Sequence, residues 1–495
     1  MRAACKMHMR LLASGAVSFA PPVQNIPPVR RTLALDIYRL AWPVLVAQLA
    51  VMAYAVIDTV MAGRYGTDDL AAVGIGAAIY FSVFVGLMGV LLAVTPTVAQ
   101  LLGAGRHNEI GEQVRQSMWL VLVLTVLSVL VYTHPEPLLR MTEAPPAVAA
   151  KVRTYLEIAA WGAPAGLAFR LFASYTTAVS LPRIMMALNL LGLALKIPLN
   201  WMLIFGHLGV PEMGSAGCAL STVIVNWIIA ALAWARCATA AEYQPYHVFA
   251  RWSWPRGRDL LHLLALGLPI GGTFLVDVTA FTFMALFIAR LGAVFSAAHQ
   301  IAANLAAVMY MLPLALGNAV GVLVGQSIGA REFGRARSVA ITGIAIALVL
   351  AIASATTLIA TRHAVANVYT IDADVQRVAA ALLLFVAGYH LFDALQAVTV
   401  NALRGYKRAA VPLVINAGGM WLIGLAGGYM IALTDVGAIL GLVTPLGARG
   451  FWLGAIAGMA TATLGILVYL LVVSGREIVI ATLRVRASAG TAKVP

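Results

Sequence analysis

The sequence predicts an all-α membrane protein with twelve transmembrane helices, arranged as two six-helix bundles related by pseudo-two-fold symmetry about the membrane normal. Three observations predict this fold class. Of the 495 residues, 62% are hydrophobic and 11% are charged, and the mean hydropathy is +0.91. Twelve segments carry almost no charge over a length that can span a bilayer. The chain also repeats part of its own sequence at an offset of 226 residues, from position 43 to position 269.

The predicted spans are centred on residues 41–63, 70–104, 116–133, 154–181, 184–206, 213–235, 260–289, 294–329, 338–361, 377–403, 409–433 and 450–475. Several exceed the minimum of about 20 residues, which predicts tilted or kinked helices. No connection between them is long enough to bury a core, so a large soluble domain is excluded. Prolines that allow kinks lie within the spans at Pro43, Pro96, Pro164, Pro198, Pro269, Pro313 and Pro412.

The internal repeat relates the first two spans to the seventh and eighth. Without a gap, Pro43, Arg64, Gly66, Ala71, Ala72, Gln100, Gly103 and Ala104 recur as Pro269, Arg290, Gly292, Ala297, Ala298, Gln326, Gly329 and Ala330. Each half has an even number of spans, so both halves enter the membrane from the same side and are parallel repeats. Proteins of this kind usually place a substrate site between the halves and move one half against the other, which predicts a transporter.

Charge gives the predicted topology and domain division. The net charge of +14 comes mainly from Lys and Arg in the tails and in the loops of one side, such as Arg404, Lys407 and Arg408. This bias predicts cytoplasmic termini, and no nucleic-acid partner is needed to explain it. We expect a disordered tail over 1–34, bundles over 35–240 and 260–475, a cytoplasmic linker over 241–259 and a cytoplasmic tail over 476–495. A signal peptide is disfavoured, because the apolar run near the N-terminus is short.

Three acidic residues lie inside predicted spans: Asp58, Asp277 and Asp393. An ionisable group at membrane depth costs about 2.5–3.5 kcal/mol on insertion scales, so each is a functional candidate. Helical spacing places further residues on the same helix faces. These neighbours are Tyr54 beside Asp58, then Thr273, Phe274, Phe281 and Met284 beside Asp277, and Tyr389 and Gln396 beside Asp393.

The side chains on these faces indicate cation chemistry. Carboxylate and hydroxyl oxygens suit a hard cation such as Na⁺, and aromatic faces and methionine suit an organic cation. For the aromatic residues alone, plain helix packing is the simpler interpretation. Burial favours the neutral form of a carboxylic acid, whereas a bound cation favours the ionised form. One buried acid can therefore hold a proton, Na⁺ or a cationic drug in turn, which favours antiport over uniport.

Two basic residues, Arg170 and Lys196, are also predicted at membrane depth. They are candidates either for lining a cavity that takes an anionic substrate or for neutralising Asp58 as internal counter-charges. An unpaired buried charge is costly, so we favour a pair between Asp58 and Lys196.

Motifs run through both halves in order: VIDTVMAG (56–63), VAQLLGAGR (98–106), KIPLNW (196–201), PEMGSAGC (211–218), LGLPIGGTFLVDVTAF (266–281), AAHQIAAN (297–304), YHLFDALQAVTVNALRGYK (389–407) and PLGARGFWLG (445–454). Over about residues 35–475 the chain resembles the multidrug and toxic compound extrusion (MATE) family, and its NorM-like branch in particular.

The resemblance implies a V-shaped antiporter of the bacterial inner membrane. It would export small hydrophobic, often cationic drugs in exchange for Na⁺ or H⁺, with no cofactor and no metal beyond transported Na⁺. It implies that Asp277, Asp393 and Tyr389 form the cation site, together with the first-span residue Asp58. Two departures from the branch concern this site. Asp277 stands where glutamate is usual, which leaves Na⁺ and H⁺ both open, and Lys196 stands where asparagine is usual, which argues against a second ion site near Asp58.

The alternative function is a flippase for lipid-linked oligosaccharides, of related two-bundle architecture. Such a protein would be expected to have a strongly cationic cavity, and two in-span bases against three acids disfavour it. An intramembrane enzyme is a third reading. The sequence shows no metal-spaced His cluster, nucleophile–base pair or phosphate-binding glycine loop to support it. The expected partners are therefore small drugs and the lipid bilayer, and a monomer suffices, although the sequence does not give the oligomeric state.

Overall fold

The computed structural model describes residues 29–140, 145–435 and 446–491, and within these ranges all regular structure is helical. The first bundle contains α2 (Val29–Tyr65), α3 (Thr67–Leu91), α4 (Val94–Gly103), α5 (His107–Thr133), α6 (Glu136–Arg140), α7 (Pro146–Ala160), α8 (Ala163–Ala178), α9 (Pro182–Phe205), η1 (His207–Gly209) and α10 (Ser215–Thr239). Most of the expected tail over 1–34 lies outside the described residues, and α2 already begins at Val29.

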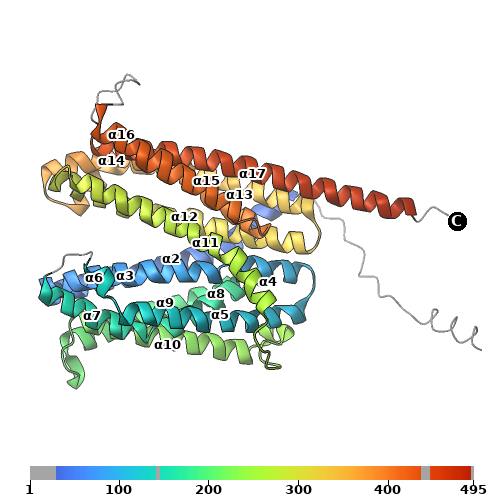
Figure 1. Cartoon of the computed structure of the whole chain (residues 1–495), viewed down its shortest axis with the longest axis horizontal. Helices are drawn as coiled ribbons and strands as arrows, with labels where there is room; N and C mark the ends of the chain where they lie inside the picture. The colour runs from blue at the N-terminus through green and yellow to red at the C-terminus, as the bar shows by residue number, and fades with distance from the viewer. Residues whose placement is uncertain (1–28, 141–144, 436–445, 492–495) are drawn as a thin grey trace, which may run out of the picture.

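The second bundle follows the short helix η2 (Ala241–Tyr246). It contains α11 (Gly257–Ala289), α12 (Ala293–Gly329), α13 (Phe333–Tyr369), α14 (Ala373–Gly405), α15 (Ala410–Ala417), the π-helix η3 (Gly418–Gly427), α16 (Gly428–Leu433) and α17 (Ala448–Thr491). Figure 1 shows the two bundles lying side by side, with α11 and α12 next to the first bundle. This arrangement confirms the predicted two-bundle, all-helical fold class.

Eleven helical segments in the described ranges are long and apolar enough to cross a membrane. The fourth predicted span, 154–181, is not among these eleven, and it is divided into α7 and α8 at Trp161 and Gly162, just before Pro164. A second division separates α3 from α4 near Pro96. A proline has no N–H to give to the carbonyl four residues earlier, and here the Leu92 carbonyl accepts from Thr95 N instead, at 3.2 Å. At both places the connecting residues keep right-handed helical backbone angles, so the helix passes through a tighter turn and then continues.

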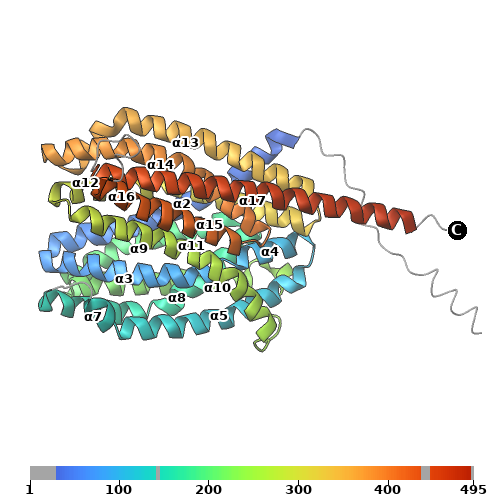
Figure 2. The ribbon, with the colours of Figure 1, turned by 45° about the horizontal axis from the view of Figure 1, so that its top comes forward.

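The last helix is longer than the predicted span. Hydropathy places the span at 450–475, whereas α17 continues to Thr491. Figures 1 and 2 show its C-terminal part projecting beyond the rest of the second bundle. Much of the segment expected as a tail is therefore a continuation of the same helix.

The linker region packs against the start of α5. Arg115 donates to the carbonyls of His247 and Val248 at 2.8 and 2.9 Å, and Gln116 donates to the carbonyl of Trp254 at 2.9 Å. Both side chains are buried, although the sequence places Arg115 in a loop. These bonds hold the connection between the bundles in a defined position.

The bundles meet mainly along three helix pairs: α3 with α11, α2 with α12, and α4 with α12. One hydrophobic core cluster runs through both bundles and includes Val90 and Val98 from the first and Leu316 and Val324 from the second. The bundles are therefore packed directly against each other beside α4.

Candidate cation and substrate site

The second bundle holds a chain of polar side chains at the level of the predicted cation site. Asn416 of α15 donates to Asp277 Oδ1 of α11 at 2.8 Å. Gln396 of α14 donates to Asn416 Oδ1 at 2.6 Å. Asn416 is fully buried and Gln396 nearly so. Two amides therefore connect three helices and fix one carboxylate oxygen of Asp277.

Asp393 lies near this chain but is not bonded into it. Its side chain is buried, with 7% of the residue exposed, and it interacts electrostatically with Asp277. Among the described residues it makes neither an ion pair nor a hydrogen bond, and Asp277 likewise has no ion pair. The site thus contains two carboxylates in electrostatic range of each other, and among the described residues no basic side chain pairs with either of them.

Aromatic rings surround the carboxylates. Tyr389, one turn before Asp393, packs edge-on against Phe281 at 5.7 Å between ring centroids and against Trp452 at 6.1 Å. Tyr310 of α12 lies within electrostatic range of both acids. Tyr389 and Asp393 lie on α14 and Phe281 lies on α11, so side chains from two separately predicted helix faces meet here.

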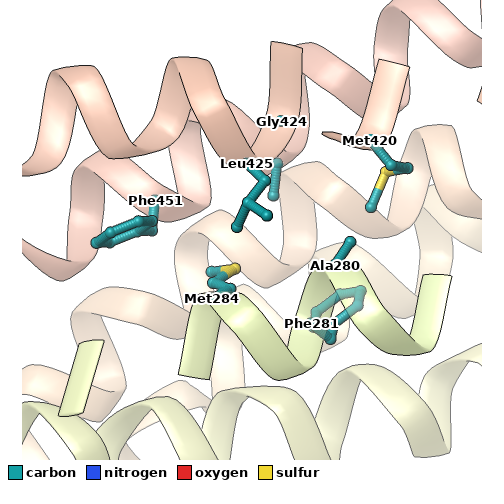
Figure 3. A pocket seen from close by; sticks show the side chains of 8 residues that line it. Ala280, Phe281, Met284, Met420, Gly424, Leu425 and Phe451 are labelled. Carbon is teal, nitrogen blue, oxygen red and sulfur yellow. The ribbon is translucent and has the colours of Figure 1, made fainter. Parts of the chain in front are cut away.

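A small apolar pocket adjoins this cluster inside the second bundle. Figure 3 shows Phe281 and Met284 of α11 facing Met420, Leu425 and Phe451 across it. Phe281 thus contacts Tyr389 on one side and borders the pocket on another. Two of the four α11 residues predicted to line a substrate cavity, Phe281 and Met284, therefore border this apolar pocket.

The remaining α11 candidates have other partners. The Thr273 hydroxyl donates to the carbonyl of Pro269 at 3.0 Å, so it is occupied within its own helix. Phe274 lies under the guanidinium of Arg404, at 5.2 Å from Cζ to the ring centroid. The sequence assigns Arg404 to a basic loop, but the structure places it in the last turn of α14 with 8% of the residue exposed.

Asp58 lies apart from these residues, inside the first bundle. Lys196 Nζ of α9 is 3.0 Å from Asp58 Oδ1, and Asn200 Nδ2 donates to the same oxygen at 2.7 Å. Tyr54, one turn earlier, donates to the carbonyl of Asn189 at 2.8 Å. The favoured pair between Asp58 and Lys196 is thus present, and Tyr54 is bonded within the bundle.

Lys196 is enclosed by polar groups. None of its surface is exposed, and Nζ also donates to Thr222 Oγ1 at 2.5 Å and to Ser221 Oγ at 3.2 Å. Its charge is therefore matched by one carboxylate and two hydroxyls. A second cation next to Asp58 would meet this fixed ammonium at close range.

Arg170 does not pair with Asp58. It lies on α8, it makes no ion pair with the described residues, and its buried Nε has no hydrogen-bond partner. Its electrostatic neighbour is Arg404 of the other bundle. Of the two suggested counter-charges, only Lys196 therefore neutralises Asp58.

Sequence reasoning missed four residues of the site: Asn416, Tyr310, Trp452 and Arg404. Three are neutral, so no cost of burying a charge marks them in a hydropathy profile. Asn416 could have been found as the only amide side chain in the eleventh span. Arg404 was assigned to a loop because it stands one residue past the predicted span.

A family model described as MatE matches residues 43–202 and 269–430 of the chain. The two matched ranges start at Pro43 and Pro269, which are the first pair of the internal repeat. Each half of the chain therefore matches the family separately.

Several relatives are similar over nearly their whole length. A "Probable multidrug resistance protein NorM" of Aromatoleum aromaticum is 43% identical over 408 residues, 82% of this chain and 88% of that protein. The "Multidrug resistance protein PmpM" of Pseudomonas aeruginosa is 38% identical over 432 residues, 87% of this chain and 89% of that protein.

Solved structures agree on the fold. A structure described as "MATE in the bent conformation" superposes with a TM-score of 0.83 at 18% identity, covering 92% of this chain and 98% of that one. Another, described as the outward-facing conformation of a multidrug resistance MATE family transporter, gives 0.80 at 18% identity, covering 92% and 99%. With a family model matched in both halves and relatives above 30% identity, this chain belongs to the MATE family of membrane transporters and to its NorM-like branch.

Proposed function

We propose that this chain is a multidrug efflux antiporter that exports hydrophobic, often cationic compounds in exchange for Na⁺ or H⁺ by alternating access. The efflux function is supported by relatives whose names describe multidrug resistance proteins. The cation exchange rests on one observation in this chain. Asp277 and Asp393 are two neighbouring carboxylates in the second bundle, and among the described residues neither has a basic partner within ion-pair distance.

Two neighbouring buried acids explain why exchange is obligatory. Bringing two negative charges together away from water is unfavourable, so the pair takes up a proton, a sodium ion or a cationic drug. Asn416 fixes the Asp277 carboxylate, whereas no described residue donates a hydrogen bond to Asp393. Binding of one cation lowers the affinity for the next because it removes the charge that attracts it. Drug and coupling ion then compete, as antiport requires.

Asp58 has a structural part in this proposal. Its charge is already compensated by Lys196 at 3.0 Å, and that ammonium is completely buried. The first bundle therefore acts as a rigid partner, while the second bundle carries the exchangeable cation.

The same proposal sets the orientation. The basic loops place both termini in the cytoplasm of a bacterium, with the chain in the inner membrane. Residues 35–240 and 260–475 are the two moving bundles, joined by the linker over 241–259. One chain contains the whole site, so a monomer suffices.

Drug efflux from proteoliposomes, with Na⁺ and pH gradients imposed one at a time, tests the proposal. We expect one of the two gradients to drive export of a hydrophobic cationic dye. Asp277→Asn and Asp393→Asn should each reduce the driven rate at least about tenfold, because each removes a negative charge at which the cation binds.

The matched control is Asp374→Asn. Asp374 lies on α14, the same helix as Asp393, but it is exposed and paired with Arg377 at 3.3 Å. This variant should export as the parent does. If the Asp277 and Asp393 variants also export as the parent does, the cation site lies elsewhere.

A further inference from the structure

The repeat-related residues Gln100 and Gln326 each reach across to the opposite bundle. Gln100 Nε2 of α4 donates to the carbonyl of Gly405 at the end of α14, at 2.8 Å. Gln326 Nε2 of α12 donates to the carbonyl of Ala178 at the end of α8 and to Ser180 Oγ, both at 2.9 Å. The acceptors also lie at corresponding places, because Ala178 ends α8 and Gly405 ends α14, one residue away from exact correspondence at the offset of 226. Each glutamine therefore bonds the C-terminal end of a helix in the other bundle.

The repeat-related glycines bring the two backbones together at the same place. A Cβ on Gly103 would lie under 3.0 Å from the carbonyl oxygen of Gln326, and a Cβ on Gly329 would lie as close to the carbonyl oxygen of Gln100. Real Cβ atoms essentially never approach so closely. Each glycine therefore packs on the backbone of the glutamine in the other helix, and α4 and α12 cross in direct contact.

This contact, formed by Gln100, Gly103, Gln326 and Gly329, is hereafter the α4–α12 crossing. It lies within one turn of the loops 104–106 and 330–332, where α4 and α12 end. These loops carry Arg106 and Arg331, so the crossing lies on the basic side of the molecule. On that side the bundles are joined by backbone contact and by three amide hydrogen bonds.

We propose that the α4–α12 crossing is the inner gate of the transporter, and that Gln100 and Gln326 are positioning residues that set the balance between its closed and open states. The inference rests on the proposed function, because a gate is needed only if the bundles alternate. Opening the basic side must separate α4 from α12, which breaks the bonds of both glutamines at once. Since each bond spans the two bundles, neither can persist when the bundles move apart.

The crossing is also connected to the cation site through Arg404 of α14. Gly405, the acceptor of Gln100, follows Arg404, which packs on Phe274 and interacts electrostatically with Asp277. A cation bound at Asp277 changes the electrostatic interaction between Asp277 and Arg404. Arg404 directly precedes Gly405, whose carbonyl accepts the hydrogen bond from Gln100. The hydrogen bond of the gate is therefore one residue away from Arg404, whose interaction with Asp277 depends on the bound cation.

The test is a distance measurement across the crossing that does not depend on drug transport. Spin labels are placed at Glu109→Cys and Arg335→Cys, two exposed positions related by the same offset, one in each bundle. The background lacks the natural cysteines Cys5, Cys218 and Cys237. Pulsed electron paramagnetic resonance in lipid nanodiscs then gives the populations of short and long distances.

Gln100→Ala and Gln326→Ala should each raise the ratio of long to short distances about 2- to 10-fold, the equivalent of losing about one hydrogen bond. The double variant should combine the two effects. Gln113→Ala is the control, because the buried amide nitrogen of Gln113 on α5 has no hydrogen-bond partner in the part of the chain that the structure describes. It should leave the populations unchanged.

Gly103→Ala should also raise the ratio of long to short distances, since the added methyl group must push α4 away from α12. If it fails to fold, the glutamine variants still decide, because they remove no backbone contact. Parent-like populations in the double glutamine variant would overturn the gate and leave the proposed efflux function untouched. Failure of the parent to export any drug would instead refute the proposed function, whatever the distances.

Discussion

Replacing Lys196 by methionine removes the charge that compensates Asp58 and keeps most of the side-chain volume. Two unit charges 3.0 Å apart attract by about 5.5 kcal/mol at an effective dielectric constant of about 20. The cost of desolvating both charges offsets much of this attraction in the intact pair. Breaking a buried pair from one side leaves the other charge uncompensated, and this costs about 3–5 kcal/mol. We therefore expect Lys196→Met to lower the free energy of unfolding by about 3–5 kcal/mol.

The loss should be recovered when the acid is neutralised too. In the Asp58→Asn, Lys196→Met double variant both charges of this pair are gone, and Asn200 can still bond the new amide. A double-mutant cycle should therefore return at least about 2 kcal/mol of the loss. The free energy of unfolding is measured by titrating the purified protein with sodium dodecyl sulfate in mixed micelles and following tryptophan fluorescence.

Lys151→Met provides the matched control. Lys151 pairs with Asp69 at 2.6 Å, but its side chain is 40% exposed, so its loss should cost at most about 1 kcal/mol. A loss as small as this for Lys196→Met would refute the reasoning. So would a double variant that is no more stable than Lys196→Met alone, because the two charges would then not depend on each other.

Three further outcomes follow from the packing. Lys196→Asn should leave insertion intact and change the ion or pH dependence of drug efflux, since it frees Asp58 for a cation. An unchanged dependence would contradict the role of Lys196 as the counter-charge of Asp58. Gly89→Ala should lower the thermal unfolding midpoint because its Cβ would meet the α11 backbone, whereas Gly74→Ala, with nothing within 4 Å, should not. Arg115→Ala should release the linker and speed tryptic cleavage at Arg251, seen on a gel; parent-like cleavage would show that the linker is held by other contacts.

The spans and the acids were predictable because both signals are local in the sequence. A run of apolar residues identifies a crossing helix without reference to its neighbours. The costly burial of Asp277 and Asp393 likewise marks them without a structure. Helical spacing then placed Tyr389 and Gln396 beside Asp393, and the structure finds Gln396 within the amide chain that reaches Asp277.

The partners across helices were not predictable, with one exception. The hydrogen bond from Asn416 to Asp277 joins residues 139 positions apart, and nothing in a single sequence gives that pairing. The Lys196 pair was the exception, because only two bases, Arg170 and Lys196, were predicted at membrane depth as partners for the acids. Arg404 shows a different limit: a helix end misplaced by two residues turned a buried arginine into a loop residue.

The repeat explains why the two halves have different chemistry despite a common helical path. At the offset of 226, Tyr54 and Asp58 correspond to Ala280 and Met284. In the first bundle these positions are filled by a bonded tyrosine and a neutralised acid. In the second bundle the smaller and softer residues border the apolar pocket beside Tyr389 and Asp393. The halves share the glutamines and glycines that join the bundles, and they differ at the positions where we propose that only the second bundle binds the exchangeable cation. The repeat therefore keeps the contact between the bundles alike in both halves, while the side chains inside each bundle differ.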